Sequence, residues 1–270
     1  MIRLHYCRAN NFGDAMNPIL IERLTGKKCK YAGKSTAQIV GIGSILNGFT
    51  RPRFGKRIKD LFTLPTNIWT SGFIKEVDYK ENFRKNIHFA AVRGKITKER
   101  IEKIVGKKID MALGDGGLLF NRLLDIAPKK KYKIGFTPHV EDLDNPLFNK
   151  LIDEIPHSIL INFRDEPLTV LKQIAECEFV LSTSMHGLIA ADSFGIPNQW
   201  LTVSNKLTGG EYKFKDYYSV FNITPKALTA DDVKNLNQNQ IEDLANQYKI
   251  NYTQVEEVQN DLLEALMDIT

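Results

Sequence analysis

Short apolar runs alternate with helical patterns over the first two-thirds of the chain. This alternation is typical of an α/β fold whose strands are parallel. Each apolar run ends in a turn of small or polar residues, as expected where a strand leads into a helix. We predict strands at residues 2–7, 38–42, 67–71, 88–92, 111–113, 133–136, 158–163, 179–182 and 198–203. We predict helices at residues 18–24, 97–105, 146–155, 168–176 and 188–194.

A basic, proline-bearing stretch interrupts this pattern, which then restarts. We therefore predict an N-terminal domain at residues 1–127, a second domain at residues 128–227 and a C-terminal helical segment at residues 228–270. In that segment Thr229 marks a helix start, and residues 252–267 form an amphipathic helix that we expect to pack on the body of the protein. Its polar face is acidic, which disfavours a membrane-surface helix. Its apolar stripe consists of Val255, Val258, Leu262, Leu263, Leu266 and Met267.

The composition is that of an ordinary globular protein, with 43% hydrophobic and 26% charged residues among 270. The formal net charge of +5 suits an anionic substrate or an acidic membrane surface, and it does not by itself indicate nucleic acid. Cys7, Cys29 and Cys177 stand far apart, so we expect neither a zinc site of cysteine pairs nor a disulfide framework. The sequence shows no signal-peptide pattern and no apolar run long enough to span a bilayer, so we expect a cytoplasmic protein.

The residues that follow the predicted strands are the candidate binding residues, because ligands of open α/β sheets bind beyond the carboxyl ends of the strands. Small residues there expose backbone N–H groups at helix N-termini, which favour phosphate or carboxylate. The glycines match neither the dinucleotide fingerprint nor the P-loop, so we expect neither bound NAD nor a P-loop nucleotide. The strand-end residues are Asn11, Gly13, Asp14, Gly43, Ser44, Ser71, Gly72, Gly114, Asp115, Ser182, Thr183, Ser184 and Gly187.

His186 stands out among the five histidines, because it lies at a predicted turn from a strand into a helix. An imidazole with a pKa near roughly 6.5 can both give and take a proton at neutral pH. Ser184 lies close by, but the nucleophile elbow of a hydrolase is absent from the sequence. His139 precedes two acidic residues, matches no metal-ligand spacing and receives no role.

Two arginines and one basic run are the candidate anion-binding groups. Arg93 and Arg164 directly follow apolar runs, where a guanidinium can hold a phosphate or carboxylate with two parallel hydrogen bonds. Residues 51–59 carry five cations and two apolar side chains. This run is either a solvated loop or a lip that attracts a lipid diphosphate or an anionic bilayer, which would place the protein peripherally at the inner face of the membrane.

Six short motifs occur in a fixed order along the chain, at residues 11–17, 41–44, 69–72, 92–94, 114–115 and 182–197. The most specific is STSMHGLIAADSFGIP at residues 182–197, and the second is NFGD at residues 11–14. Over about residues 1–220, this ordered set resembles the polysaccharide pyruvyl transferase family, especially its exopolysaccharide branch.

The resemblance implies two Rossmann-like domains that face each other across a cleft, in an arrangement similar to GT-B glycosyltransferases. It also implies transfer of pyruvate from phosphoenolpyruvate onto two hydroxyls of a sugar, which forms a cyclic ketal. The acceptor is then a polysaccharide precursor, which we expect to be linked to a polyprenyl diphosphate. One acid and one base suffice for such a reaction, so we expect neither a metal nor another cofactor.

Within this reaction we expect His186 to be the proton donor and Asp14 or Asp115 to be the base. Arg93 with Arg164 is expected to hold the anionic groups of the donor. Many family members carry an arginine where this chain has Ser184, so Arg93, Arg164 or Lys206 would have to compensate for the missing cation. Asp216 and Tyr217 are expected to line the acceptor side. The expected donor-binding set also includes Asn11, Gly13, Gly43, Ser44, Ser71, Gly72, Ser182, Thr183, Ser184 and Gly187.

Two other functions stay open at this point. A GT-B-like glycosyltransferase using a nucleotide sugar would share the cleft, the cationic groups and the histidine. A non-catalytic carbohydrate-binding relative would fit the altered residue Ser184. Nucleic-acid binding is disfavoured, because the basic run is short.

Overall fold

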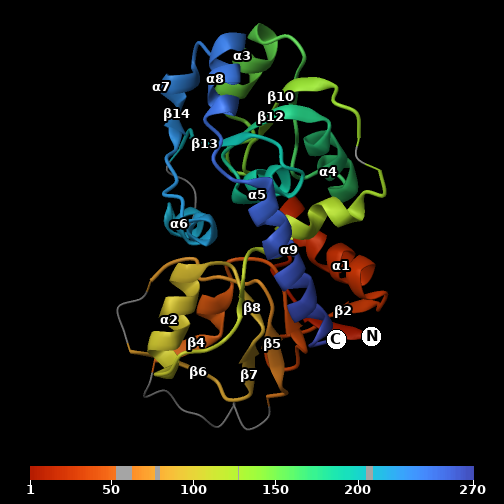
Figure 1. Ribbon diagram of the computed structural model, residues 1–270, viewed down its shortest axis with the longest axis vertical. Coiled ribbons are helices and arrows are strands. Elements are labelled where there is room, and N and C mark those ends of the chain that lie inside the picture. The colour runs from red at the N-terminus through yellow and green to blue at the C-terminus, as the bar shows by residue number, and fades with distance from the viewer. Residues whose placement is uncertain (53–62, 77–79, 127, 205–208) are drawn as a thin grey trace.

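The computed structural model describes residues 1–52, 63–76, 80–126, 128–204 and 209–270, and its strands form two five-stranded parallel sheets (Figure 1). The predicted α/β class with parallel strands is therefore confirmed. The first sheet has the order β2 (Cys29–Tyr31), β1 (Ile2–His5), β3 (Ile39–Val40), β5 (Thr66–Ile68) and β7 (Ile87–Phe89). The second sheet has the order β11 (Ser158–Leu160), β10 (Tyr132–Thr137), β12 (Cys177–Ser182), β13 (Asn198–Thr202) and β14 (Leu228–Thr229).

The carboxyl ends of the first sheet continue as isolated bridges. Gly43 pairs with Ser71, and Ser71 pairs with Val92. Val92 ends β8 (Ala91–Val92), which pairs in parallel with β9 (Ala112–Leu113). The residues that follow neighbouring strands are thereby held side by side, as the sequence predicted for a binding edge. Beside this sheet, β4 (Thr50–Pro52) and β6 (Glu81–Phe83) form an antiparallel pair.

The helices follow the predicted positions, with their ends moved by a few residues in most cases. The short helices α6, α7 and α8 and the 3-10 segments were not delimited from the sequence. The helices are α1 (Phe12–Thr25), α2 (Lys95–Val105), α3 (Pro146–Glu154), α4 (Pro167–Ala175), α5 (Met185–Ser193), α6 (Tyr212–Tyr218), α7 (Ala230–Val233), α8 (Gln238–Asn246) and α9 (Tyr252–Met267). The 3-10 segments are η1 (Leu46–Gly48), η3 (Gly116–Leu123) and η4 (Ser219–Phe221).

Helix α1 begins six residues before the predicted start at residue 18, because Asn11 caps it. Pro18 lies inside the helix and has no N–H to donate to the carbonyl oxygen of Asp14. The side chain of Asn17 supplies that hydrogen bond instead, at 3.2 Å from Nδ2 to the Asp14 oxygen. The helix can therefore continue through the proline, so our prediction from Pro18 alone was wrong.

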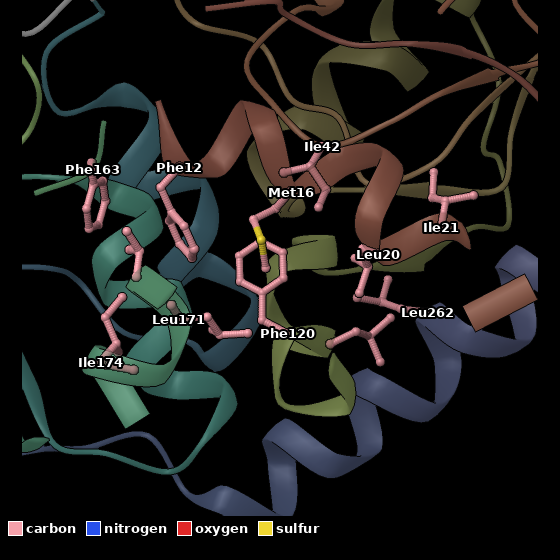
Figure 2. Packing of buried hydrophobic residues seen from close by; sticks show 14 of the residues in the cluster. Phe12, Met16, Leu20, Ile21, Ile42, Phe120, Phe163, Leu171, Ile174 and Leu262 are labelled. Carbon is pink, nitrogen blue, oxygen red and sulfur yellow. The ribbon is translucent and has the colours of Figure 1, made fainter. Parts of the chain in front are cut away.

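The largest apolar cluster joins elements that follow both sheets (Figure 2). In Figure 2, Phe12 and Met16 of α1 lie toward Phe120 of η3, while Leu171 belongs to α4 and Leu262 to α9. The Phe12 ring lies 5.5 Å from that of Phe120 and 5.0 Å from that of Phe163. Because one core contacts both sheets, α1 and α5 are held in fixed places relative to each other. The predicted domain boundaries stay predictions.

Helix α9 has the predicted bounds and crosses from beside α5 to the first sheet (Figure 1). Val255, Leu262 and Leu266 of its predicted stripe are buried, whereas Met267 is exposed. The buried residue Gln259 donates to the carbonyl oxygen of Leu118 at 2.7 Å, a contact that an apolar pattern cannot reveal. Among the described residues, no helix has the length and apolar character needed to cross a membrane.

Candidate active site

A pocket of about 180 Å³ lies where loops that follow strands of both sheets meet. Five predicted site residues line it together: Asn11, Asp14, Ser44, Ser184 and His186. The first three follow strands of the first sheet, and the last two follow β12 of the second. The other lining residues are Cys7, Ile45, Ile74, His139, Val140, Phe163, Met185 and Lys213.

Asn11 and Asp14 are fixed to each other at the start of α1. The backbone N–H of Asp14 donates to Asn11 Oδ1 at 3.1 Å, and Asn11 Nδ2 donates to Asp14 Oδ2 at 2.6 Å. Burial raises the pKa of the Asp14 carboxyl, while hydrogen bonds from Asn11 and Cys7 and the charge of Lys213 act against this rise. A carboxyl held in this way can exchange a proton with a bound ligand.

His186 lies in the first turn of α5 and packs against Gly13 of α1. A Cβ atom at Gly13 would overlap the imidazole ring, so the glycine is required for this contact. His186 Nε2 is buried and has no hydrogen-bond partner among the described residues. Burial lowers the pKa of His186 to about 3, and the positive charges of Lys213, Arg93 and His139 contribute to the decrease. The imidazole is therefore neutral at pH 7 when the pocket is empty.

His139 faces the same pocket from the loop after β10. Its backbone N–H donates to Thr183 Oγ1 at 2.8 Å, and its Nδ1 accepts from the N–H of Glu141 at 3.3 Å. Burial lowers the pKa of His139, and the charge of Lys213 lowers it further. His139 received no role from its sequence spacing, because only the fold brings it to His186.

Lys213 of α6 is a pocket residue that the sequence did not identify as a site residue. Among the described residues that line the pocket, it is the only lysine or arginine. Burial lowers its pKa to about 8, and the charge of Arg93 acts in the same direction, whereas Asp14 and Asp142 oppose the decrease. The buried residues Phe214, Tyr217 and Tyr218 of α6 have helical spacing, but this pattern does not show which loops Lys213 would meet.

Arg93 does not present its guanidinium to the pocket. Its side chain is fully buried and donates from Nε to Asp216 Oδ2 at 2.9 Å, from Nη1 to Ser44 Oγ at 2.5 Å and from Nη2 to the carbonyl oxygen of Phe73 at 2.6 Å. Each of its three nitrogens already donates to a protein acceptor, and donor binding by Arg93 stays a prediction.

Asp216 and Tyr217 are likewise fully buried rather than turned toward an acceptor. Asp216 accepts from Arg93 and also from the backbone N–H and the hydroxyl of Thr97, at 2.8 and 2.7 Å. The Tyr217 hydroxyl donates to Asp192 Oδ2 at 2.6 Å. Both side chains hold α6 in place and neither lines the pocket, so the acceptor-lining role that we expected for them stays a prediction.

Comparison with known proteins places this geometry in a family. The family model described as polysaccharide pyruvyl transferase matches residues 9–205, which include every pocket residue except Cys7 and Lys213. The chain belongs to the polysaccharide pyruvyl transferase family. The resemblance found in its sequence motifs is therefore confirmed.

Two relatives in this comparison have curated names. One is the uncharacterised protein L143 of Acanthamoeba polyphaga mimivirus, 29% identical over 227 residues that span 82% of this chain and 75% of L143. The other is the succinoglycan biosynthesis protein ExoV of Rhizobium meliloti (strain 1021), 26% identical over 216 residues that span 79% of this chain and 62% of ExoV. The crystal structure of the uncharacterised protein KP1_0663 from Klebsiella pneumoniae subsp. pneumoniae NTUH-K2044 is similar at 14% identity with a TM-score of 0.44, over 84% of this chain and 92% of that one.

In this pyruvyl transferase family member, several predicted donor-binding residues do not line the pocket and make close contacts elsewhere. A Cβ atom at Gly72 would overlap the Arg93 guanidinium, and one at Gly187 would overlap Thr137 Oγ1. The Ser71 hydroxyl donates to the carbonyl oxygen of Gly41. Gly43 has a φ of 130°, a conformation that favours glycine, where the chain turns toward Ser44. These residues permit close packing of the backbone and do not line the pocket.

The loop between β12 and α5 is fixed by its own hydroxyl groups. The Ser182 hydroxyl lies 2.8 Å from the carbonyl oxygens of both Thr137 and Ser184, and it accepts from the Ser184 N–H at 3.0 Å. Thr183 Oγ1 accepts from the N–H of His139. Ser182 and Thr183 therefore position the loop, and Ser184 is the residue of this segment that faces the pocket beside His186.

Asp115, the other candidate base, does not line the pocket. It is fully buried at the start of η3, where its Oδ1 accepts from the Gly117 N–H at 2.9 Å. Burial raises its pKa to about 6, against the Gly117 hydrogen bond and the charge of Arg93. Because Asp115 does not line the pocket, Asp14 is the carboxyl that fits the expected base.

Arg164 lies at the rim and not in the pocket. It is exposed, and its Nη2 donates to the carbonyl oxygen of Val140, a lining residue, at 3.2 Å. Lys206 lies outside the described residues, as does most of the basic run at residues 51–59. The expected membrane contact through that run stays a prediction.

Two further observations bound the chemistry of the site. Among the described residues, no group of three or more His, Cys, Asp or Glu side chains is arranged to hold a metal ion. A larger hollow of about 640 Å³ lies beside β13, with Trp200, Lys226 and Tyr248 among its lining residues. None of the expected catalytic or donor-binding residues lines that hollow, so the smaller pocket is the candidate active site.

Proposed function

We propose that this protein transfers pyruvate from phosphoenolpyruvate onto two hydroxyls of a sugar and so forms a cyclic ketal. The observation that carries the proposal is that α1 and α5, from the two sheets, begin at one pocket that also contains His186 and Lys213. Helix N-termini and cations favour a ligand that bears both a phosphate and a carboxylate. Membership of the family and the similarity to ExoV, a succinoglycan biosynthesis protein, support a polysaccharide acceptor.

On this proposal, the two parallel sheets are the centres of the two Rossmann-like halves of a GT-B-like arrangement. The donor would occupy the pocket between the ends of the strands, and the sugar would approach from solvent. The acceptor would be a precursor linked to a polyprenyl diphosphate, since a growing polysaccharide needs a carrier. The family membership alone supports this last step.

The reaction adds a proton to the methylene carbon of phosphoenolpyruvate and bonds one sugar hydroxyl oxygen to the adjacent carbon. The bond from that carbon to the phosphate oxygen breaks, and inorganic phosphate leaves. The second hydroxyl oxygen then closes the ketal ring. Two hydroxyl protons are released, of which one balances the proton taken up by the methylene carbon and the other leaves with phosphate or solvent.

His186 is the proposed proton donor, although its pKa of about 3 makes it neutral in the empty pocket. A bound phosphate and carboxylate would offset the nearby positive charges and favour the imidazolium form. Binding of the donor would therefore favour protonation of His186, the proposed acid. Asp14, whose pKa is raised by burial, is the proposed base for the sugar hydroxyl.

The test is turnover of phosphoenolpyruvate with a panel of galactose, glucose and mannosamine glycosides, including lipid-diphosphate forms. We expect phosphate release together with a ketal-sized gain in the mass of one acceptor. His186→Ala should lower kcat by roughly 10²–10⁴-fold, the usual contribution of a general acid. His88→Ala is the matched control, because His88 is exposed on β7 and should leave kcat unchanged.

Three results would contradict the proposal. An unchanged rate in His186→Ala would remove the assigned acid. Absence of turnover across the panel, with thermal stabilisation by a nucleotide sugar and none by phosphoenolpyruvate, would instead indicate a glycosyltransferase. Stabilisation by phosphoenolpyruvate without turnover on any acceptor would indicate a non-catalytic carbohydrate-binding relative.

A further inference from the structure

We infer that Lys213 is the cation that binds the anionic groups of the donor, and that Asp216 and Tyr217 are positioning residues that hold it over the pocket. This inference rests on the proposed function for the identity of the donor. It reverses the roles expected from the sequence, in which Arg93 bound the donor and the segment of Asp216 and Tyr217 faced the acceptor.

The two other described cations that we expected to bind the donor, Arg93 and Arg164, are already engaged or turned away. Arg93 is fully buried, and each of its three nitrogens donates to a protein acceptor. Arg164 is exposed and bonded to the backbone of Val140. Lys213 lines the pocket beside Asp14 and His186, and none of the ion pairs among the described residues includes it.

Helix α6 is anchored on two sides by hydrogen bonds of its own residues. Residues 213, 216 and 217 are three and four positions apart and therefore share one face of the helix. Asp216 bonds to Arg93 and Thr97 after the first sheet, and a Cβ atom at Gly94 would overlap its carbonyl oxygen. Figure 1 shows α6 between the two halves of the molecule.

The opposite anchor ties α6 to the helix that carries His186. Tyr217 donates to Asp192, which is a fully buried residue of α5. Asp192 also accepts from Tyr248 and Asn198, each at 2.6 Å. Since His186 begins α5 and Asp192 lies near its end, these bonds fix the place of Lys213 relative to His186. These bonds fix the backbone of α6, from which the Lys213 side chain reaches the pocket.

Several charged and titratable groups lie near Lys213. The groups that face Lys213 are Arg93, Asp14, Asp142, His139 and His186, and its own charge lowers the pKa values of both histidines. Burial with Arg93 nearby lowers the pKa of Lys213 to about 8. Because Arg93 is paired with Asp216 and the pKa values of both histidines are lowered, Lys213 is the cation that lines the pocket, and it fits an anionic group of a ligand. This arrangement also predicts that the pocket loses affinity for anions when Lys213 loses its proton.

The experiment is calorimetric binding of phosphoenolpyruvate and of inorganic phosphate to the full chain, without acceptor, from pH 7 to about 9.5. Wild-type affinity should fall more steeply above about pH 8, where Lys213 loses its proton, than it does near pH 7. Lys213→Met should weaken binding at pH 7 by about tenfold to a hundredfold, the size expected for a lost hydrogen bond to a charged group. Lys213→Arg should keep binding and remove the decrease above pH 8, because a guanidinium stays charged there.

Lys215→Met is the matched control. Lys215 lies two residues away on the same helix, but it is exposed and paired with Glu211 at 2.7 Å, so binding should not change. Melting temperatures of all variants show whether α6 remains folded. Unchanged affinity in Lys213→Met, or identical pH profiles for wild type and Lys213→Arg, would overturn the inference.

The two proposals fail in different ways. If phosphoenolpyruvate binds through Lys213 and no acceptor is ever pyruvylated, the proposed function fails and the inference stands. If wild type turns over and Lys213→Met keeps its KM for phosphoenolpyruvate, the inference fails and the function stands. If the wild-type chain binds neither phosphoenolpyruvate nor phosphate, both are overturned.

Discussion

Arg93, which pairs with Asp216 of α6, and Lys213 of α6 itself have different surroundings. Arg93 is fully buried, with Asp216, Ser44 and the backbone of Phe73 around its guanidinium. Lys213 is half-buried in the pocket and has no ion pair among the described residues. The Arg93 charge is paired within the protein, whereas the Lys213 amine lies in the pocket, 5.4 Å from the centroid of the Phe214 ring.

The chemistry of the two side chains suits this division. A guanidinium stays charged and offers donors in several fixed directions, so it can connect separate elements inside a protein. An amine has a single charged centre whose pKa responds to burial, so its charge can change near neutral pH. Residue type therefore says less about a binding role than the number of acceptors that already surround the group.

The largest expected effect comes from removing the buried cation. Arg93→Met should lower the free energy of unfolding by roughly 3–5 kcal/mol, because the Asp216 carboxylate is left buried without its charged partner. Chemical denaturation followed by circular dichroism measures this change. A variant of wild-type stability that has lost only its affinity for phosphoenolpyruvate would show that Arg93 is a donor-binding residue after all.

A second substitution sharpens this result. Asp216→Asn in the Arg93→Met background removes the unpaired charge and keeps an oxygen for the backbone N–H of Thr97. The double variant should therefore be more stable than Arg93→Met alone. If the two losses simply add, the two residues do not act as a pair.

An intermediate effect is expected where α1 touches α5. In Gly13→Ala the added methyl group would overlap the His186 ring, so the imidazole must move. We expect a loss of roughly 1–3 kcal/mol in the free energy of unfolding from overpacking. Turnover should fall further than stability alone explains, since an acid displaced by about 1 Å can cost about 10²-fold in rate.

Gly33→Ala provides the comparison for this substitution. A Cβ atom at Gly33 would meet no other atom within 4 Å, so stability and turnover should stay at wild-type values. Equal turnover in Gly13→Ala and Gly33→Ala would show that the position of the His186 ring does not matter for the reaction.

The sequence predicted the sheets better than the ends of the helices. Parallel strands are apolar on both faces, so their runs stand out, and the helix at residues 252–267 matched α9. Strand β2 was missed, because its residues Cys29–Tyr31 lie at the edge of the sheet and are partly or fully exposed. The start of α1 was misplaced because a side chain, Asn17, replaces the hydrogen bond that Pro18 cannot make.

The sequence also predicted half of the site. Residues that follow strands meet at one edge of a parallel sheet, and this rule brought Asp14, Ser44 and His186 to one pocket. It could not show that Arg93 pairs with Asp216, which lies 123 residues away in the sequence. Nor could it place Lys213. Helix α6 is held beside the pocket by Asp216 and Tyr217, whose partners are far away in the sequence.

The smallest effect is expected at Ser44, which contacts Arg93 and also lines the pocket. Its hydroxyl accepts from Arg93 Nη1 at 2.5 Å, and its side chain lines the pocket of Lys213. Ser44→Ala should lower the free energy of unfolding by only about 1 kcal/mol, because Ser44 is half-buried and water can replace the lost acceptor. Affinity for phosphoenolpyruvate should change by less than in Lys213→Met, since the guanidinium stays bonded to Asp216 and Phe73. A larger loss of affinity in Ser44→Ala than in Lys213→Met would contradict the separate roles of Arg93 and Lys213. Donor binding would then depend on Arg93 through Ser44 and not on the Lys213 amine.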